Sequence, residues 1–179
     1  MEFTGQGSRP ALRLVEGTRA PQVEWAWFCG NCAAPSPHGD APPPTARVCP
    51  SCGLGLLLET RRDVLPSSHD AFLVIDSALL VQAVSRRAQA LLGVTEEGAV
   101  DRPVAELLAP ADAEAQGRAG FAAALADAAA GADEPANAIV RPWNTFGVRM
   151  RARIAPCGPP RAALIVLEDP AARRLRAVQ

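Results

Sequence analysis

The sequence contains no lysine, so all 18 of its basic residues are arginines, and 19 acidic residues balance them to a formal net charge of −1. A chain so close to neutrality has no general attraction to nucleic acid or to an anionic membrane surface. No apolar run approaches the roughly 20 residues that are needed to cross a bilayer, and residues 1–10 are too polar for the core of a signal peptide. We therefore expect a cytoplasmic protein that does not associate with membranes.

Patterns of catalytic residues are missing as well. The sequence has no glycine-rich phosphate loop and no Ser/His/Asp arrangement, and Asp76, Glu106 and Asp112 have no histidine or nucleophile that the sequence would bring to them. General acid–base catalysis therefore has no set of residues on which to rest, and we expect no enzymatic activity. The length of 179 residues suits one ordinary domain with a small additional unit.

Four of the five cysteines form two Cys-x-x-Cys pairs, Cys29 with Cys32 and Cys49 with Cys52, separated by residues 33–48. This spacing is typical of a single tetrahedral zinc site with four thiolate ligands. Such a metal replaces the hydrophobic core that so short a segment cannot build. Four protein ligands leave no open coordination position, so the predicted Zn²⁺ has a structural role and not a catalytic one.

The segments beside the cysteines read as two strands. Alternation places Val23, Trp25 and Trp27 on one face of a strand over residues 23–28, and residues 54–59 form the return strand. The order strand, knuckle, loop, knuckle, strand, with Cys49-Pro50-Ser51-Cys52-Gly53 as the second knuckle, resembles the zinc ribbon families. The first knuckle departs from their pattern because Ala33 stands where glycine is commoner. Rubredoxins share these knuckles and hold iron, but their longer loop and aromatic core are missing here, so zinc is favoured.

The rest of the chain predicts two strands, several helices and then three strands. The expected strands are 72–76, 79–84, 136–143, 146–155 and 161–168, and the expected helices are 86–92, 104–108 and 113–130. Ser85 is placed to cap the first helix, Gly93 to end it, and Asp112 to cap the long helix. The predicted fold class is α+β: a five-stranded antiparallel sheet with helices on one face, preceded by a small zinc ribbon.

Two of the last three strands carry specific expectations. In residues 146–155 the apolar side chains of Val148, Met150, Ala152 and Ile154 alternate with the arginines at 149, 151 and 153. The run 162–167 is apolar at every position, so that strand should be central in the sheet or covered on both faces.

Residues 70–76 (DAFLVID), 84–94 (VSRRAQALLGV) and 102–108 (RPVAELL) together resemble the motifs of PAS domains, with Ser85 where asparagine is frequent. The resemblance covers about residues 69–170. It implies a sensory or interaction module that binds a small molecule between the sheet and its helices and commonly forms dimers.

The resemblance also allows cofactors to be weighed. Haem-binding forms use a histidine on a helix that faces the pocket, and the histidine near this domain, His69, precedes its first strand. Flavin photoreceptor forms need a cysteine in the middle of the domain, and none lies between Cys52 and Cys157. Haem and covalent flavin are therefore not expected, whereas Trp143 and Asn144 leave a non-covalent flavin open.

The predicted organisation has five parts: a flexible N-terminus (1–20), the zinc ribbon (21–60), a polar linker (61–68), the PAS domain (69–170) and a basic tail (171–179). Candidate contact residues are Trp25 and Trp27, which either anchor a partner or pack against the PAS sheet, and Trp143. The row formed by Arg149, Arg151 and Arg153 either binds an acidic partner or a carboxylate ligand, or is simply a solvated face.

These observations predict a non-enzymatic regulatory or sensory module. It would bind a small ligand, a protein partner or a second copy of itself through the PAS domain. The alternative is a transcription-associated protein that binds nucleic acid or RNA polymerase through the ribbon. Residues 23–59 contain a single arginine, Arg47, which argues against phosphate contacts. A third possibility is redox or metal sensing by the thiolates.

Overall fold

The computed structural model describes residues 23–36, 41–43, 45–111, 115–143, 145 and 147–168, with the backbone alone for 115–119. The predictions for the N-terminus 1–20, the helix cap Asp112, the pocket residue Asn144 and the tail 171–179 lie outside these residues. Across the described ranges, no helix combines the length and apolar character that crossing a membrane requires.

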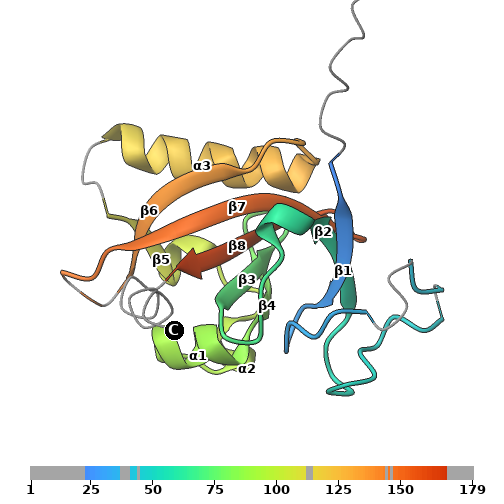
Figure 1. Cartoon of the computed structure of the whole chain (residues 1–179). Helices are drawn as coiled ribbons and strands as arrows, with labels where there is room; N and C mark the ends of the chain where they lie inside the picture. The colour runs from blue at the N-terminus through green and yellow to red at the C-terminus, as the bar shows by residue number, and fades with distance from the viewer. Residues whose placement is uncertain are drawn as a thin grey trace, which may run out of the picture.

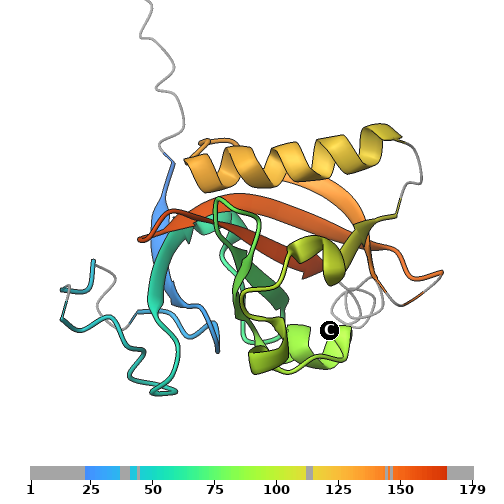
Figure 2. The same cartoon turned by 180° about the vertical axis from the view of Figure 1, so that it is seen from behind.

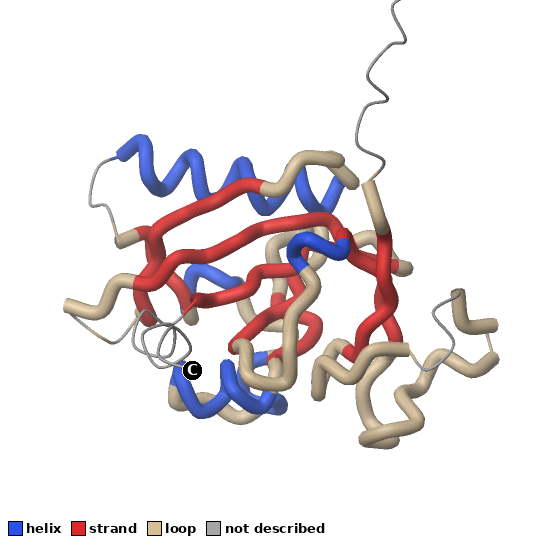
Figure 3. Tube along the Cα trace, viewed as in Figure 1, coloured by secondary structure: helices blue, strands red, loops and turns tan. Residues whose placement is uncertain are grey.

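The strands form one sheet in which every pairing is antiparallel (Figure 1). They are β1 (Trp25–Cys29), β2 (Leu57–Arg61), β3 (Ala71–Ile75), β4 (Val81–Val84), β5 (Leu108–Pro110), β6 (Ala136–Pro142), β7 (Met150–Gly158) and β8 (Ala162–Glu168). The order in the sheet is β1-β2-β7-β8-β3-β4, with β6 also paired to β7 and β5 paired to β6. The tube in Figure 3 shows how these strands follow one another around the curled sheet.

The expected antiparallel sheet is confirmed, but the expected number of strands is wrong, because the sheet has eight strands and not five. The five predicted strands correspond to β4, β3, β8, β7 and β6. The nine-residue β7 is long enough to pair with β6 along Met150–Ile154 and with β2 at Cys157 and Gly158. The hairpin of β1 and β2 therefore extends the same sheet, at one end of it (Figures 1 and 2).

The helices are α1 (Arg86–Leu92), α2 (Glu96–Ala99), α3 (Ala115–Ala130) and the 3₁₀ helices η1 (Arg62–Val64) and η2 (Val104–Glu106). The caps of α1 are as predicted, since the Ser85 hydroxyl accepts from the Ala88 amide at 3.2 Å and Gly93 ends the helix at φ 66°. The helix expected at 104–108 is shorter, because the Leu107 carbonyl accepts from the Trp143 amide and the chain then pairs as β5.

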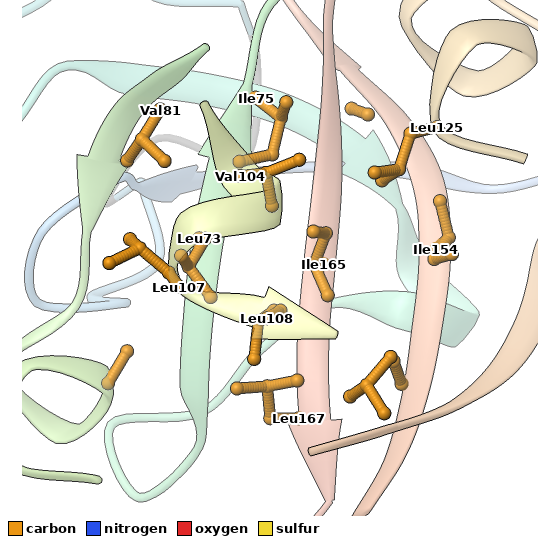
Figure 4. Close-up of a cluster of buried hydrophobic side chains, with 14 of the residues drawn as sticks. Leu73, Ile75, Val81, Val104, Leu107, Leu108, Leu125, Ile154, Ile165 and Leu167 are labelled. Atoms are coloured by element: carbon orange, nitrogen blue, oxygen red, sulfur yellow. The ribbon is translucent and has the colours of Figure 1, made fainter. Parts of the chain in front are cut away.

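The larger hydrophobic cluster is formed by residues of the sheet and of several helices (Figure 4). Met150, Ala152 and Ile154 of β7 point into it, as the predicted alternation requires. Val148, which the same pattern placed with them, precedes β7 and is 39 % exposed, and Ala155 on the other side is buried. The strands β3 and β8 contribute Leu73, Ile75, Ile165 and Leu167 to the larger cluster. The buried residues of α1, α2, α3 and η2 belong to this same cluster. The helices do not all lie on one face as expected, because Val64 of η1 belongs to a second cluster on the other side of the sheet.

The opposite side of the sheet is apolar as well. Phe72 and Val74 of β3 and Leu164 and Val166 of β8, together called the outer face below, are all nearly fully buried. Because β8 lies between β3 and β7 and is buried on both sides, the prediction of a central or covered strand is confirmed. The residues that cover the outer face come from the cysteine-bearing hairpin and from η1, and they are described next.

Candidate metal centre

The four predicted ligands converge on one point. The sulfurs of Cys29, Cys32, Cys49 and Cys52 all lie within 4.8 Å of one another. The Cys29 and Cys52 sulfurs are 3.6 Å apart, and those of Cys32 and Cys49 are 3.9 Å apart. In a tetrahedron with metal–sulfur bonds of about 2.3 Å, sulfurs are separated by about 3.8 Å. The thiols are therefore spaced to hold one tetrahedral metal ion.

Each knuckle is a turn closed by its own backbone. In the first, the Ala33 amide donates to the Cys29 carbonyl at 3.0 Å, and Ala33 adopts φ 59°, a conformation that explains why glycine is commoner at this position. In the second, the Gly53 amide donates to the Cys49 carbonyl at 2.8 Å with Gly53 at φ 68°. The strand β1 ends at Cys29 and pairs it with Leu57, so the hairpin fixes where the first ligand lies.

Nearby backbone amides and burial shift the pKa values of the thiols in opposite directions. Backbone N–H groups of Gly55 and Leu54 lower the pKa of Cys52 from 9.0 to about 6, so this sulfur is a thiolate at neutral pH. Burial raises the pKa of Cys29 and of Cys32. The amides of Asn31 and Cys32 nevertheless point at the Cys29 sulfur, at 3.4 and 3.5 Å. A metal cation would supply the charge that lets the buried sulfurs ionise together.

The two tryptophans of β1 have different surroundings. Trp27 is only 8 % exposed and packs with Cys29, Cys49 and Leu57 in a cluster of its own. The Arg47 guanidinium lies 5.9 Å from the centre of the Trp27 ring, which closes the remaining side. Trp25 is 41 % exposed. Trp27 therefore supports the cysteine cluster, and Trp25 is the one that presents a surface.

The ribbon hairpin, meaning β1 and β2 with their knuckle loops, is joined to the rest of the sheet by pairing. Glu59 pairs with Gly158 and Thr60 with Cys157. The buried Thr60 hydroxyl donates to the Pro156 carbonyl at 2.9 Å, and the Arg47 guanidinium donates to the Pro159 carbonyl at 3.0 Å.

Side chains of the ribbon hairpin and of η1 cover the outer face. Phe28 and Leu58 pack against it, and the Phe28 ring meets Phe72 edge to face at 5.8 Å. Residues 61–68, expected to be a polar linker, include Val64, which is 2 % exposed and belongs to the same cluster. The hairpin and the five predicted strands thus share one packed body.

The three arginines of the row have different surroundings. The Arg149 guanidinium donates to the Ala111 carbonyl at 3.4 Å. Arg153 pairs with Glu168, Nε to Oε1 at 3.0 Å, and also donates to the Asp63 carbonyl of η1 at 2.8 Å. Arg151 is exposed and lines a groove between α3 and β6.

That groove has a volume of about 680 Å³. Its walls include Phe121 and Ala124 of α3 and Ala138 and Ile139 of β6, with Asn137 and Arg151 as polar members. Trp143, which the sequence suggested as a pocket residue, is 54 % exposed and does not line it. The helical pattern marked Phe121 as an inward residue of the long helix, but nothing in the sequence indicated that it meets Ile139, because that contact depends on how α3 crosses the sheet.

No protein-family model matches the chain, and no curated protein matches it. Among solved structures, it is similar to the PAS domain of nitrogen regulation protein NR(II) from Vibrio parahaemolyticus, with 12 % identity, 56 % of this chain and 88 % of that chain covered, and a TM-score of 0.41. It is also similar to a chain of the E. coli DhaR(N)–DhaL complex, with 14 % identity, 56 % and 32 % covered, and a TM-score of 0.38. These are likenesses of fold.

From β3 to β8 the elements run as two strands, then helices with the short strand β5 among them, then three strands; apart from β5, this is the order on which the PAS resemblance rested. The chain therefore combines the order of elements expected from that resemblance with a four-cysteine cluster.

Proposed function

We propose that this protein is a non-enzymatic regulatory module in which a structural zinc ribbon and a PAS-type domain act as one body. The observation that carries the proposal is the pairing of β2 with β7, which makes the ribbon hairpin a continuation of the PAS-type sheet. A conformational change in the zinc ribbon would therefore alter the PAS-type domain, and a change in that domain would alter the ribbon. The signal would leave by binding a protein partner or a second copy of the chain, in the cytoplasm.

We infer that the metal of this site is zinc. All four donors are cysteine sulfurs, they lie at tetrahedral spacing, and Trp27 and Leu57 pack behind them. A closed tetrathiolate site of this kind suits a structural Zn²⁺. Iron uses the same four ligands in rubredoxins, so the metal content of the purified protein distinguishes the two.

Two surfaces support binding. The groove between α3 and β6 has apolar walls and the Arg151 guanidinium at its side, which suits a small apolar molecule that carries a carboxylate. At the tip of the ribbon hairpin, Val48, Leu54 and Leu56 are 55 %, 71 % and 52 % exposed within nine residues of chain. Three neighbouring exposed apolar side chains suit a protein partner.

Nucleic acid is the less favoured ligand. Arg47 is the one basic residue of segment 23–59, and its guanidinium already contacts the Trp27 ring and the Pro159 carbonyl. Phosphate contacts need free cationic side chains, and their number sets how steeply affinity falls with salt. Salt-dependent binding of DNA or RNA by the ribbon would favour the alternative function.

Native mass spectrometry of the full chain, combined with a pull-down, tests the proposal. We expect one zinc ion per chain and either a retained small molecule, a second chain or a captured partner. A matched pair of variants, Leu54→Ser at the ribbon tip and Arg151→Ala at the groove, separates the two surfaces. A zinc-loaded monomer that retains no ligand and captures no partner would contradict the proposed function.

A further inference from the structure

The outer face of the sheet has a cover that belongs to the same chain. Phe72, Val74, Leu164 and Val166 are each 3 % exposed or less. Phe28 and Leu58 of the ribbon hairpin and Val64 of η1 lie over them in one cluster. Without this cover, four large apolar side chains on two adjacent strands would meet water together, which a soluble monomer rarely tolerates.

The cover depends on the metal for its own structure. Apart from the cysteines, the cluster that holds the hairpin together contains Trp27, Leu57 and the partly buried Ala34. A two-stranded hairpin with so few buried residues is marginal in water by itself. Its β2 strand pairs with β7 at only two positions, Glu59 with Gly158 and Thr60 with Cys157. Besides the contacts of Phe28 and Leu58 with the outer face, metal binding is therefore a main source of free energy for folding the hairpin.

We propose that the ribbon hairpin is a metal-locked cover over the outer face, and that release of the metal exposes this face to a second copy of the chain. The inference rests on the metal of the proposed function and adds what the metal controls. It makes the outer face an interaction surface that is blocked in the loaded protein. Loss of zinc to a chelator would then be converted into self-association.

A second copy fits the exposed surface for two reasons. The rim of the outer face carries an anion and a cation side by side, Glu168 and Arg153 at 3.0 Å, so two such faces related by a twofold axis present matching charges. Release of β2 also frees the edge of β7 at Cys157 and Gly158. An antiparallel edge can pair with the same edge of an identical chain across that axis.

The reactivity of the Cys157 thiol shows whether the ribbon hairpin covers the outer face. It lies in the outer-face cluster, 5 % exposed, opposite Thr60 of β2. Burial raises the pKa of its thiol to about 12, so the covered thiol is protected from alkylation both sterically and chemically. Displacement of the hairpin removes both kinds of protection.

The test uses the full chain under reducing conditions, with zinc bound or after chelation. N-ethylmaleimide labelling is followed peptide by peptide, and mass is measured by light scattering. Labelling is done at a dilution at which the chelated chain is monomeric, because a second copy on the outer face would protect Cys157 again. Under these conditions we expect Cys157 to label faster by about tenfold or more after chelation. At higher concentration we expect the mass to double. If the four ligand cysteines label and Cys157 stays protected, the cover does not need the metal and the proposal is wrong. If Cys157 labels and the protein stays a monomer, the second copy is the wrong occupant.

Variants separate the two halves of the proposal. With zinc bound, Phe28→Ala should speed Cys157 labelling, whereas Trp25→Ala, on the opposite side of the same strand, should not. After chelation, Glu168→Arg should keep Cys157 reactive but weaken the dimer, because both rim residues are then cationic. Equal labelling of the two β1 variants, or an undiminished Glu168→Arg dimer, would count against the proposal. None of these readouts involves a ligand or partner of the zinc-loaded protein. The inference can therefore fail without contradicting the proposed function.

Discussion

The rings of Phe28 and Phe72 meet edge to face, with centroids 5.8 Å apart and an interplanar angle of 76°. Phe28 directly precedes Cys29 in β1, so alternation along the strand sends one side chain to the sheet and the next to the sulfur cluster. The metal ligand Cys29 and the contact of Phe28 with Phe72 are therefore held in place by adjacent residues of one strand. Disorder at either residue should be transmitted to the other.

Cys49→Ser should remove the metal and loosen the hairpin while the central sheet stays folded. Three thiolates bind zinc more weakly than four, and the hairpin has little core of its own. Hydrogen exchange should show that the amides of Trp25–Cys29 and Leu57–Arg61 lose protection, while those of Ala71–Ile75 and Ala162–Glu168 keep it. Cys157→Ser is the matched control and should retain zinc and its protection pattern. Uniform loss of protection in Cys49→Ser would show that the ribbon is required for the whole fold.

Gly55→Ala should damage the metal site without touching a ligand. A Cβ at Gly55 would lie 2.4 Å from the Cys29 sulfur and 2.9 Å from the Asn31 amide nitrogen. We expect zinc affinity, measured by competition with a chromophoric chelator, to fall by about 10- to 100-fold.

Gly53→Ala is the comparison for this variant, because a Cβ there meets nothing within 4 Å and the cost is backbone strain at φ +68°. Strain of this kind is worth about 1 kcal/mol. Its zinc affinity should therefore stay close to that of the unmodified protein. Equal effects of the two substitutions would show that the contact at Gly55 is unimportant.

Acidification should release the metal, and Cys52 should set the lower end of the transition. Its pKa is lowered to about 6, so its stabilising charge is present above the ordinary value of 9.0 and is lost as the pH falls through about 6. Cys52→Ser should therefore move the midpoint of zinc release to higher pH. Cys157→Ser should leave the midpoint unchanged, and a common midpoint for all three proteins would contradict this account of the thiolates.

Val64→Ala should destabilise the protein although it lies in a polar stretch. Val64 is buried against the outer face, and truncation of such a side chain costs about 2 kcal/mol. Val48→Ala, which changes the same side chain at an exposed position of the ribbon tip, should change stability by less than about 0.5 kcal/mol. Urea denaturation of the zinc-loaded proteins measures both, and equal midpoints would mean that η1 does not help to cover the sheet.

Local signals in the sequence predicted much of this structure. The two knuckles predicted the sulfur cluster, Ser85 and Gly93 predicted the ends of α1, and alternation predicted the inward side chains of Met150, Ala152 and Ile154. Each of these signals lies within a few residues of the feature that it predicts. Trp25 and Trp27 were correctly placed on one face, but alternation does not reveal that Arg47 and the cysteines cover only the second of them.

The features that the sequence did not reveal are contacts between distant segments. The Thr60 hydroxyl and the Pro156 carbonyl are 96 positions apart, and no local pattern indicates that they meet. Val64 and its neighbour Leu65 lie in an otherwise polar stretch, so the burial of Val64 follows from the docking of the hairpin and not from periodicity. The strand β5 is three residues long and exists because β6 offers it a partner. Pairing of this kind depends on tertiary context, which overrides local propensity.

X-ray absorption at the zinc edge, on the purified full chain, identifies the metal and its ligands. We predict one zinc ion per chain with four sulfur neighbours at about 2.3 Å. Loss of the metal on chelation should coincide with the appearance of reactive Cys157. A site that holds iron, that contains oxygen or nitrogen ligands, or that takes up no metal would contradict the assignment of a structural zinc ribbon on which the rest depends.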